Sequence, residues 1–317
     1  MSERMIATNE QKYFPWFTTL FSLLLIVVYV SMALYSHSFS IDFGLLENFG
    51  APYAIQIYQR HVYGVVLNNL IHVNLLHLLS NLLGLWLFGA FIERRIGWFK
   101  MAFFGLVSSV FGSMIQLAFT NDAGLGISSA VFGFYALILS MSFKNRLFRM
   151  KYIYALGFFL FGSLVFMTIT DKIFGQQVAI EAKLGGLFWG FLMGIAQSEG
   201  EIKRSYLSLF ALPFSLAAVT LLYAPWSSEW QCARGIHYHQ QQDFLTAETY
   251  YKKALSIDSQ NKLAKENYTL IQVDRLSKQA YKAHMAKDYT DARRLYLKIL
   301  ALKKNNHWAR ENLKELP

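Results

Sequence analysis

Seven apolar runs, each at or close to the length needed to cross a bilayer, dominate this chain. A transmembrane helix takes about 20 residues, and the runs lie at 16–35, 70–91, 98–119, 126–142, 150–169, 178–197 and 206–224. Of the 317 residues, 54% are hydrophobic and 16% are charged, where soluble domains carry about a quarter charged. We therefore expect an all-α, multi-pass membrane protein, in which a polar segment, 1–15, precedes a membrane domain, 16–224.

Basic residues gather in every second connection between these runs. Residues 93–100, 144–151 and 203–204 hold most of them, whereas the intervening connections hold only Arg60 and Lys172. The positive-inside rule then predicts a cytoplasmic N-terminus and an extracytoplasmic tail, as in a bacterial inner membrane. The lysines and arginines behind the net charge of +10 lie in these connections and in the tail, so we expect a lipid bilayer and no nucleic acid as partner. No Ala-x-Ala cleavage site follows the first run, which is expected to remain as an anchor.

Polar side chains interrupt three of the runs at a similar depth. His72, His77 and Asn81 lie in the second run, Ser128 in the fourth and Lys183 in the sixth, and all three runs begin at the predicted outer face. Ionisable groups inside spans are costly and tend to be functional, so this placement predicts a polar site facing outward. The alternatives are that Ser128 bonds back to its own helix, or that the group is a packing network.

The spacing of the histidines favours hydrogen bonding over metal binding. His72 and His77, at i and i+5, diverge by about 140° around a helix, whereas His77 and Asn81, at i and i+4, share one face. Donors placed in this way can stabilise a developing oxyanion. The single cysteine, Cys232, excludes an intramolecular disulfide and a cysteine-based metal site. No metal and no cofactor are expected.

Four motifs, in this order along the chain, resemble the rhomboid family of intramembrane serine proteases. They are His72-Val-Asn-Leu-Leu-His77-Leu-Leu-Ser-Asn81, Gly89-Ala-Phe-Ile-Glu93-Arg-Arg-Ile-Gly97, Gly126-Ile-Ser128, and Leu184-Gly185-Gly186-Leu-Phe-Trp-Gly190. The resemblance covers about residues 16–224. It implies a six-helix core and a serine endopeptidase acting on transmembrane protein substrates near the outer face. The seventh apolar run adds a seventh spanning helix to this core. It further implies Ser128 as nucleophile, His77 and Asn81 as oxyanion donors, and His72 as a structural polar residue.

The chain departs from the family pattern at three places. Ser129 replaces a glycine beside the nucleophile, and Tyr63-Gly64 stands where a Trp-Arg pair is expected. The histidine that serves the family as general base is replaced by Lys183.

The lysine leaves two functions open. A buried lysine can serve as the base of a serine, so Ser128 and Lys183 form one candidate catalytic pair. Alternatively, Lys183 lies only about five residues into its run, so that its stem can reach the interface and its amine can stay charged. The chain is then a non-catalytic protein that binds membrane helices. A transporter is disfavoured, because the polar groups show no path across the membrane.

The tail, 225–317, turns polar and repeats itself with an offset of 45 residues. Aligning Ala247 with Ala292 also pairs Gly235 with Ala280, Phe244 with Tyr289 and Tyr251 with Tyr296. Small and aromatic positions of this kind suit antiparallel helix pairs and resemble the tetratricopeptide repeat. The alternative is an unrelated helical hairpin domain. A repeat domain in this place is expected to recruit a protein partner.

Overall fold

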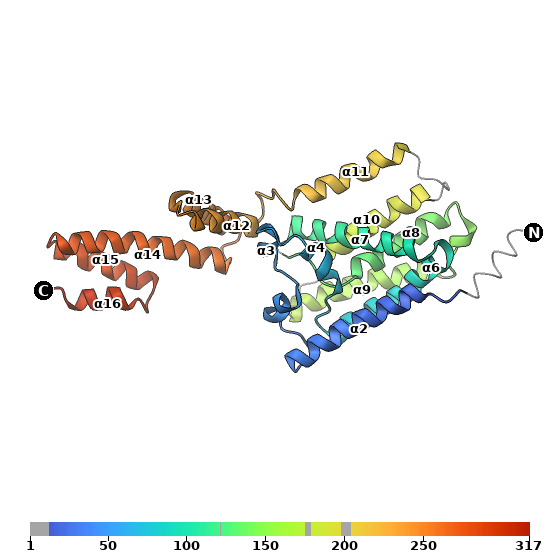
Figure 1. Cartoon of the computed structure of the whole chain (residues 1–317), viewed down its shortest axis with the longest axis horizontal. Coiled ribbons are helices and arrows are strands. Elements are labelled where there is room, and N and C mark those ends of the chain that lie inside the picture. Colours follow the sequence, from blue (N-terminus) through green and yellow to red (C-terminus); the bar gives the residue numbers. More distant parts are fainter. Residues whose placement is uncertain (1–12, 121, 175–178, 198–203) are drawn as a thin grey trace, which may run out of the picture. The chain divides into compact units, whose positions relative to one another are not determined.

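The computed structural model describes residues 13–120, 122–174, 179–197 and 204–317. It divides the chain into two compact units, Met1–Ala224 and Pro225–Pro317. Within the described ranges, the only strand-like feature is a single antiparallel bridge between Ser40 and Asn74. The expected all-α fold with several apolar helices is confirmed (Figure 1).

Three helices of the first unit are long and apolar enough to cross a membrane. They are α2 (Trp16–Ser36), the continuous helix Leu75–Ile96, and α7 (Trp98–Phe119). Leu75–Ile96 consists of α5 (Leu75–Gly84), η3 (Leu85–Gly89) and α6 (Ala90–Ile96). The remaining runs form α8 (Ser128–Ser142), α9 (Ile153–Phe174), α10 (Ile180–Gln197) and α11 (Arg204–Val219). Such a set of apolar helices supports a multi-pass integral membrane protein.

The second run becomes helical later than its apolar residues indicate. Asn74 precedes α5, and its Oδ1 accepts the His77 N–H at 2.8 Å, which caps the first turn of the helix. His72 therefore lies in the segment before α5, and only His77 and Asn81 lie on the helix. The reason is local, since a capping asparagine starts a helix more sharply than hydropathy can show.

Short helices connect the spans. The described ones are η1 (Phe43–Phe49), α3 (Ala54–Tyr58), α4 (Gly64–Leu67), η2 (Asn68–Leu70) and η4 (Arg146–Phe148). The Tyr58 hydroxyl donates to the Leu117 carbonyl at 3.2 Å, and Asn69 Nδ2 donates to Ser113 Oγ at 3.2 Å. Both bonds tie the long first connection to α7.

Glycines bring α8 and α10 into backbone contact. A Cβ added at Gly186 would collide with the backbone of Ser129, and one added at Gly190 would collide with the backbone of Gly133. Because both pairs ascend in sequence together, the two helices run parallel. Helix α7 packs against both of them: Gly112 meets Ser129 of α8 and the Ala182 carbonyl of α10, while Gly105 meets Phe134, so α7 runs antiparallel to α8. This close packing is what the glycine spacing of the sixth run predicts.

The second unit consists of two helical hairpins and a closing helix. Helices α12 (Ser228–Gln240) and α13 (Phe244–Ile257) form the first hairpin, and the long α14 (Lys262–Met285) pairs with α15 (Tyr289–Leu302). Helix α16 (His307–Lys314) packs on α15. The hairpins match in detail: His239 bonds to the Tyr251 hydroxyl at 3.3 Å, and His284 bonds to the Tyr296 hydroxyl at 3.0 Å. Both pairs obey the 45-residue offset of the sequence.

A carboxylate at the start of this unit titrates near neutral pH. Burial, together with the charge of Asp258, raises the pKa of Glu229 to about 7. Asn261 Nδ2 donates to Glu229 Oε1 at 3.0 Å. Since the folded-state pKa lies above the ordinary value of 4.5, folding favours the protonated acid. The resulting stabilisation is fully present below pH 4.5 and is lost as the pH rises through about 7.

Glu229→Gln is therefore expected to make the tail less sensitive to pH. In the full-length protein in detergent, wild type should lose about 1–2 kcal/mol of tail stability between pH 5 and pH 8.5, after allowance for solvent exposure. The variant should lose much less. The measurement is the temperature at which added protease begins to digest the tail. Glu266→Gln, at an exposed position of α14, is the matched control and should follow wild type. Equal pH dependence of Glu229→Gln and wild type would contradict the prediction.

Candidate active site

The first turns of α5, α8 and α10 lie at the same end of the membrane unit. Gly84 of α5 meets Val131 of α8, whereas Gly89, further along, meets Phe134. The α5–α6 helix therefore runs parallel to α8, as α10 does. His77 lies in the first turn of α5, Ser128 is the first residue of α8, and Lys183 is in the first turn of α10. The structure thus brings these residues to one end, as the sequence predicts.

Ser128 is buried, with 6% of its surface exposed. Serines in membrane helices often bond back to their own helix, as Ser140 does to the Ala136 carbonyl at 2.9 Å. No such bond of the Ser128 hydroxyl occurs in the part of the chain that the structure describes. Ile127 precedes it as the cap residue and offers no side-chain acceptor to the first turn of α8. The Ser128 hydroxyl is therefore not tied to its own helix.

His77 and Asn81 approach the loop that leads into α8. A Cβ added at Gly126 would lie 2.7 Å from His77 Nε2 and 3.0 Å from Asn81 Nδ2. Gly126 has φ +78°, which glycine adopts readily, so the loop can pass directly over both side chains two residues before Ser128. Asn81 is 4% exposed, and its Nδ2 has no hydrogen-bond partner among the described atoms. It is a buried donor beside Ser128 with unused capacity.

His72 lies next to His77, in the segment before α5. It is fully buried, its Nδ1 lies 3.3 Å from the Leu70 carbonyl, and its ring centroid lies 4.9 Å from that of His77. The His72 Nε2 atom has no partner in the described structure. This arrangement agrees with a structural position next to His77 and brings no third metal ligand. Across the described residues, no three His, Cys, Asp or Glu side chains form a metal-binding group.

Lys183 is buried, with 7% of its surface exposed, and its Nζ donates to the Ala179 carbonyl at 3.1 Å. Its stem thus turns back one turn along its own chain while staying inside the protein. Gly186, three residues later on the same face, touches the backbone of Ser129, which places Lys183 on the side of α10 that faces α8. Among the described residues, no hydrogen bond joins Lys183 to Ser128. The structure brings the two residues to one region without pairing them.

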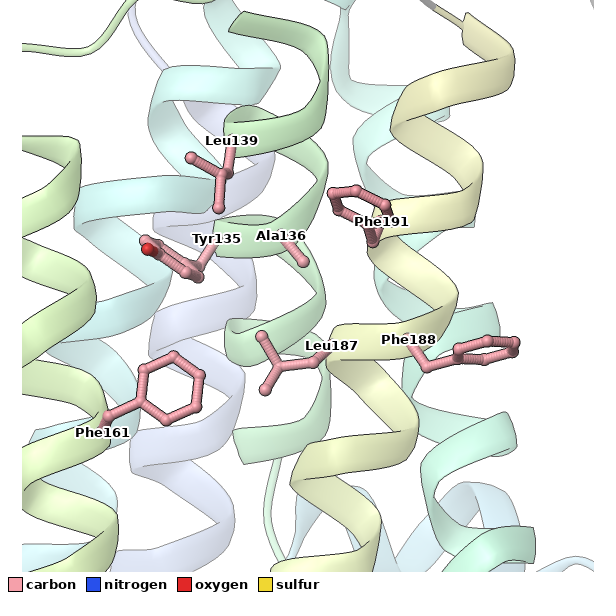
Figure 2. A pocket seen from close by; sticks show the side chains of 7 residues that line it. All are labelled: Tyr135, Ala136, Leu139, Phe161, Leu187, Phe188 and Phe191. Atoms are coloured by element: carbon pink, nitrogen blue, oxygen red, sulfur yellow. The ribbon is translucent and has the colours of Figure 1, made fainter. Parts of the chain in front are cut away.

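A separate apolar pocket of about 330 Å³ lies further along α8 (Figure 2). It is lined by Tyr135, Ala136 and Leu139 of α8, Phe161 of α9, and Leu187, Phe188 and Phe191 of α10. The sequence does not predict this pocket, because its residues are ordinary members of apolar runs. Apart from the Tyr135 hydroxyl its lining is apolar, and it includes none of the polar residues at the first turns of α5, α8 and α10.

Fold and site together define a helical, multi-pass membrane protein with a buried serine, amide, imidazole and amine at one end of its bundle. Residues 59–199 match the family model described as Rhomboid domain. Over 185 residues the chain is 26% identical to the rhomboid protease GluP of Bacillus subtilis (strain 168). That match covers 57% of this chain and 35% of the relative, so the chain spans about a third of that protein's length. Both comparisons support the rhomboid family for the membrane part of the chain.

Proposed function

We propose that this chain is a rhomboid-type membrane protein that binds transmembrane segments of client proteins and does not hydrolyse them. The observation that carries the proposal is the bond from Lys183 Nζ to the Ala179 carbonyl. A serine becomes a useful nucleophile only when an adjacent base takes its proton. With the Lys183 amine directed to this carbonyl, no hydrogen bond in the described structure links it to Ser128 for the transfer of a proton.

Client binding takes place in the membrane domain, 16–224, with α11 as the seventh span. The site keeps the serine and the two oxyanion donors, His77 and Asn81, of the protease pattern. In the orientation that the basic connections predict, the N-terminus is cytoplasmic and the site faces the outer side of a bacterial inner membrane. The client is thus a transmembrane protein that reaches the site near the outer surface.

The tail, 225–317, recruits a second protein through a tetratricopeptide-like surface. The support for this assignment is that the two halves of the tail match each other. They share the histidine–tyrosine hydrogen bond and the asparagine cap of the following helix. Asn261 and Asn306, 45 residues apart, each accept the N–H of the alanine three residues later, at 2.9 Å. Stacked pairs of this kind commonly present an extended binding surface.

Proteolysis by a Ser128–Lys183 pair is the second candidate. The observation in its favour is that both side chains are buried at the same end of the bundle, at 6% and 7% exposure. Serine–lysine pairs are a known variant of serine-protease chemistry. This candidate requires that the lysine side chain rotate away from Ala179 and that its amine be neutral. It is a distinct function, because it predicts turnover where the first proposal predicts binding alone.

A fluorophosphonate probe and a transmembrane model substrate separate the two candidates. We expect wild type to show neither labelling nor cleavage, and Lys183→His to gain labelling of at least about a hundredfold, as restoration of a general base allows. Ser128→Ala in the Lys183→His background should abolish the gain, whereas Ser129→Ala in that background should keep it. Labelling of wild type that is lost in both Ser128→Ala and Lys183→Ala would instead establish the catalytic pair.

A further inference from the structure

We infer that the client segment carries a carboxylate, and that this carboxylate binds where Lys183, Asn81 and the first turn of α8 converge. The inference rests on the proposed function and names the chemistry of its client. The ligand is the permanent negative charge of the client carboxylate. It is bound by Lys183, the lysine that replaces the histidine of the family pattern.

Three kinds of donor face this place and none of them is an acid. Asn81 supplies an amide nitrogen that is buried and has no partner in the described structure. The first turn of α8 supplies backbone N–H groups that a helix cannot satisfy internally, and the cap residue Ile127 gives them no side-chain oxygen. The positive end of the helix dipole favours an anion at the same point. Ser128 adds a hydroxyl that is not bonded to its own helix.

The Lys183 ammonium forms no direct ion pair with an acid among the described residues. An ammonium has three donors, and the Ala179 carbonyl takes one of them. Glu181 lies two residues before Lys183 in the sequence, and Asp122 lies six residues before Ser128. Glu181 is partly exposed and forms no ion pair with Lys183, and Asp122 Oδ1 accepts the Gly124 N–H at 3.2 Å. A buried charge without a partner is costly, so an incoming carboxylate would relieve this cost.

The donors come from adjoining turns of α5, α8 and α10. Gly126 places His77 Nε2 and Asn81 Nδ2 side by side immediately before Ser128. The Ala182 carbonyl and the Ser129 side chain both lie against Gly112, so that the first turn of α10 adjoins the first turn of α8. The cluster is therefore one site with one fixed positive charge.

The depth of the site favours a protein carboxylate over a lipid phosphate. Asn81 is six residues beyond the start of α5, which is about 9 Å along a helix. A lipid phosphate stays in the hydrated headgroup region, whereas a side chain on a transmembrane segment can carry a carboxylate to this depth. Asp or Glu on the client, about five residues from the end of its helix, fits the position.

The test uses full-length protein in phosphatidylcholine vesicles and two synthetic transmembrane peptides of about 22 residues. The peptides are identical except for Asp or Asn at the fifth position from the end that lies beside Ser128. Binding is followed by energy transfer between labelled peptide and labelled protein. We expect wild type to bind the Asp peptide about tenfold more tightly, as a charge-assisted hydrogen bond in a buried site allows. This comparison needs no variant, so it does not depend on how a substitution folds.

Two variants assign the preference to Lys183. In Lys183→Met the ratio of the two affinities should fall to within about twofold, and in Lys100→Met, which removes an exposed charge at the start of α7, it should stay near tenfold. Equal binding of both peptides by wild type would overturn the inference and leave helix binding in place. No binding of either peptide would overturn both. Lys183-dependent binding of phosphatidylglycerol without an Asp preference would assign the site to a lipid phosphate and overturn the inference.

Discussion

Replacing Glu93 by alanine is expected to destabilise the membrane unit by about 3–5 kcal/mol. The Glu93 side chain is 1% exposed, and its two oxygens accept the Phe17 N–H at 2.9 Å, the Thr18 N–H at 2.8 Å and the Thr18 hydroxyl at 2.7 Å. The carboxylate thus caps the first turn of α2 from the end of α6. Alanine would leave these three buried donors without an acceptor, and each unsatisfied donor costs about 1–3 kcal/mol.

The measurement is the midpoint of unfolding when sodium dodecyl sulfate is titrated into protein held in a mild detergent. Glu93→Gln keeps one acceptor oxygen and should fall between wild type and Glu93→Ala. Glu47→Ala removes an acid from an exposed position and should unfold with wild type. If Glu93→Ala also unfolded with wild type, the carboxylate would not hold the two helices together.

The contact of Glu93 with the start of α2 cannot be predicted from the sequence. In the sequence, Glu93 is one charge in a connection beside Arg94 and Arg95, and nothing there identifies donors 75 residues earlier. Hydropathy locates apolar runs because burial in lipid is an average property of about 20 residues. A cap between two spans depends on single atoms, so only the structure reveals it.

In the candidate site, too, some residue positions can be predicted from the sequence and others cannot. The i, i+4 spacing of His77 and Asn81 correctly places both on one face, because that spacing is fixed by helix geometry. His72 cannot be placed in this manner, since the Asn74 cap starts the helix after it. The partner of Lys183 is equally invisible in the sequence. Whether its amine meets Ser128 or Ala179 depends on rotations about four side-chain bonds, which spacing does not constrain.

The contact made by the glycines of α10 can be predicted from the sequence only in part. Their four-residue spacing in α10 predicts a close helix contact, and α8 is the neighbour that fills it, with Gly186 against Ser129 and Gly190 against Gly133. The sequence identifies the glycine-bearing face of α10, and the structure identifies the atoms that a side chain on this face would meet. Those atoms are backbone, which cannot move aside as the end of a flexible side chain can.

Gly190→Ala is therefore expected to separate α8 from α10 and to cost at least about 2–3 kcal/mol, near the upper range for overpacking. A Cβ at this position would meet the carbonyl group and Cα of Gly133. Alanine is otherwise the better helix former by about 1 kcal/mol, so the contact must outweigh that gain.

Gly162→Ala on α9 is the matched control, because a Cβ there has no atom within 4 Å. It should be neutral or stabilising by up to about 1 kcal/mol in the same detergent titration. Equal stability of the two variants would mean that α10 does not need this close approach, and that the position of Lys183 beside the first turn of α8 is fixed by other contacts.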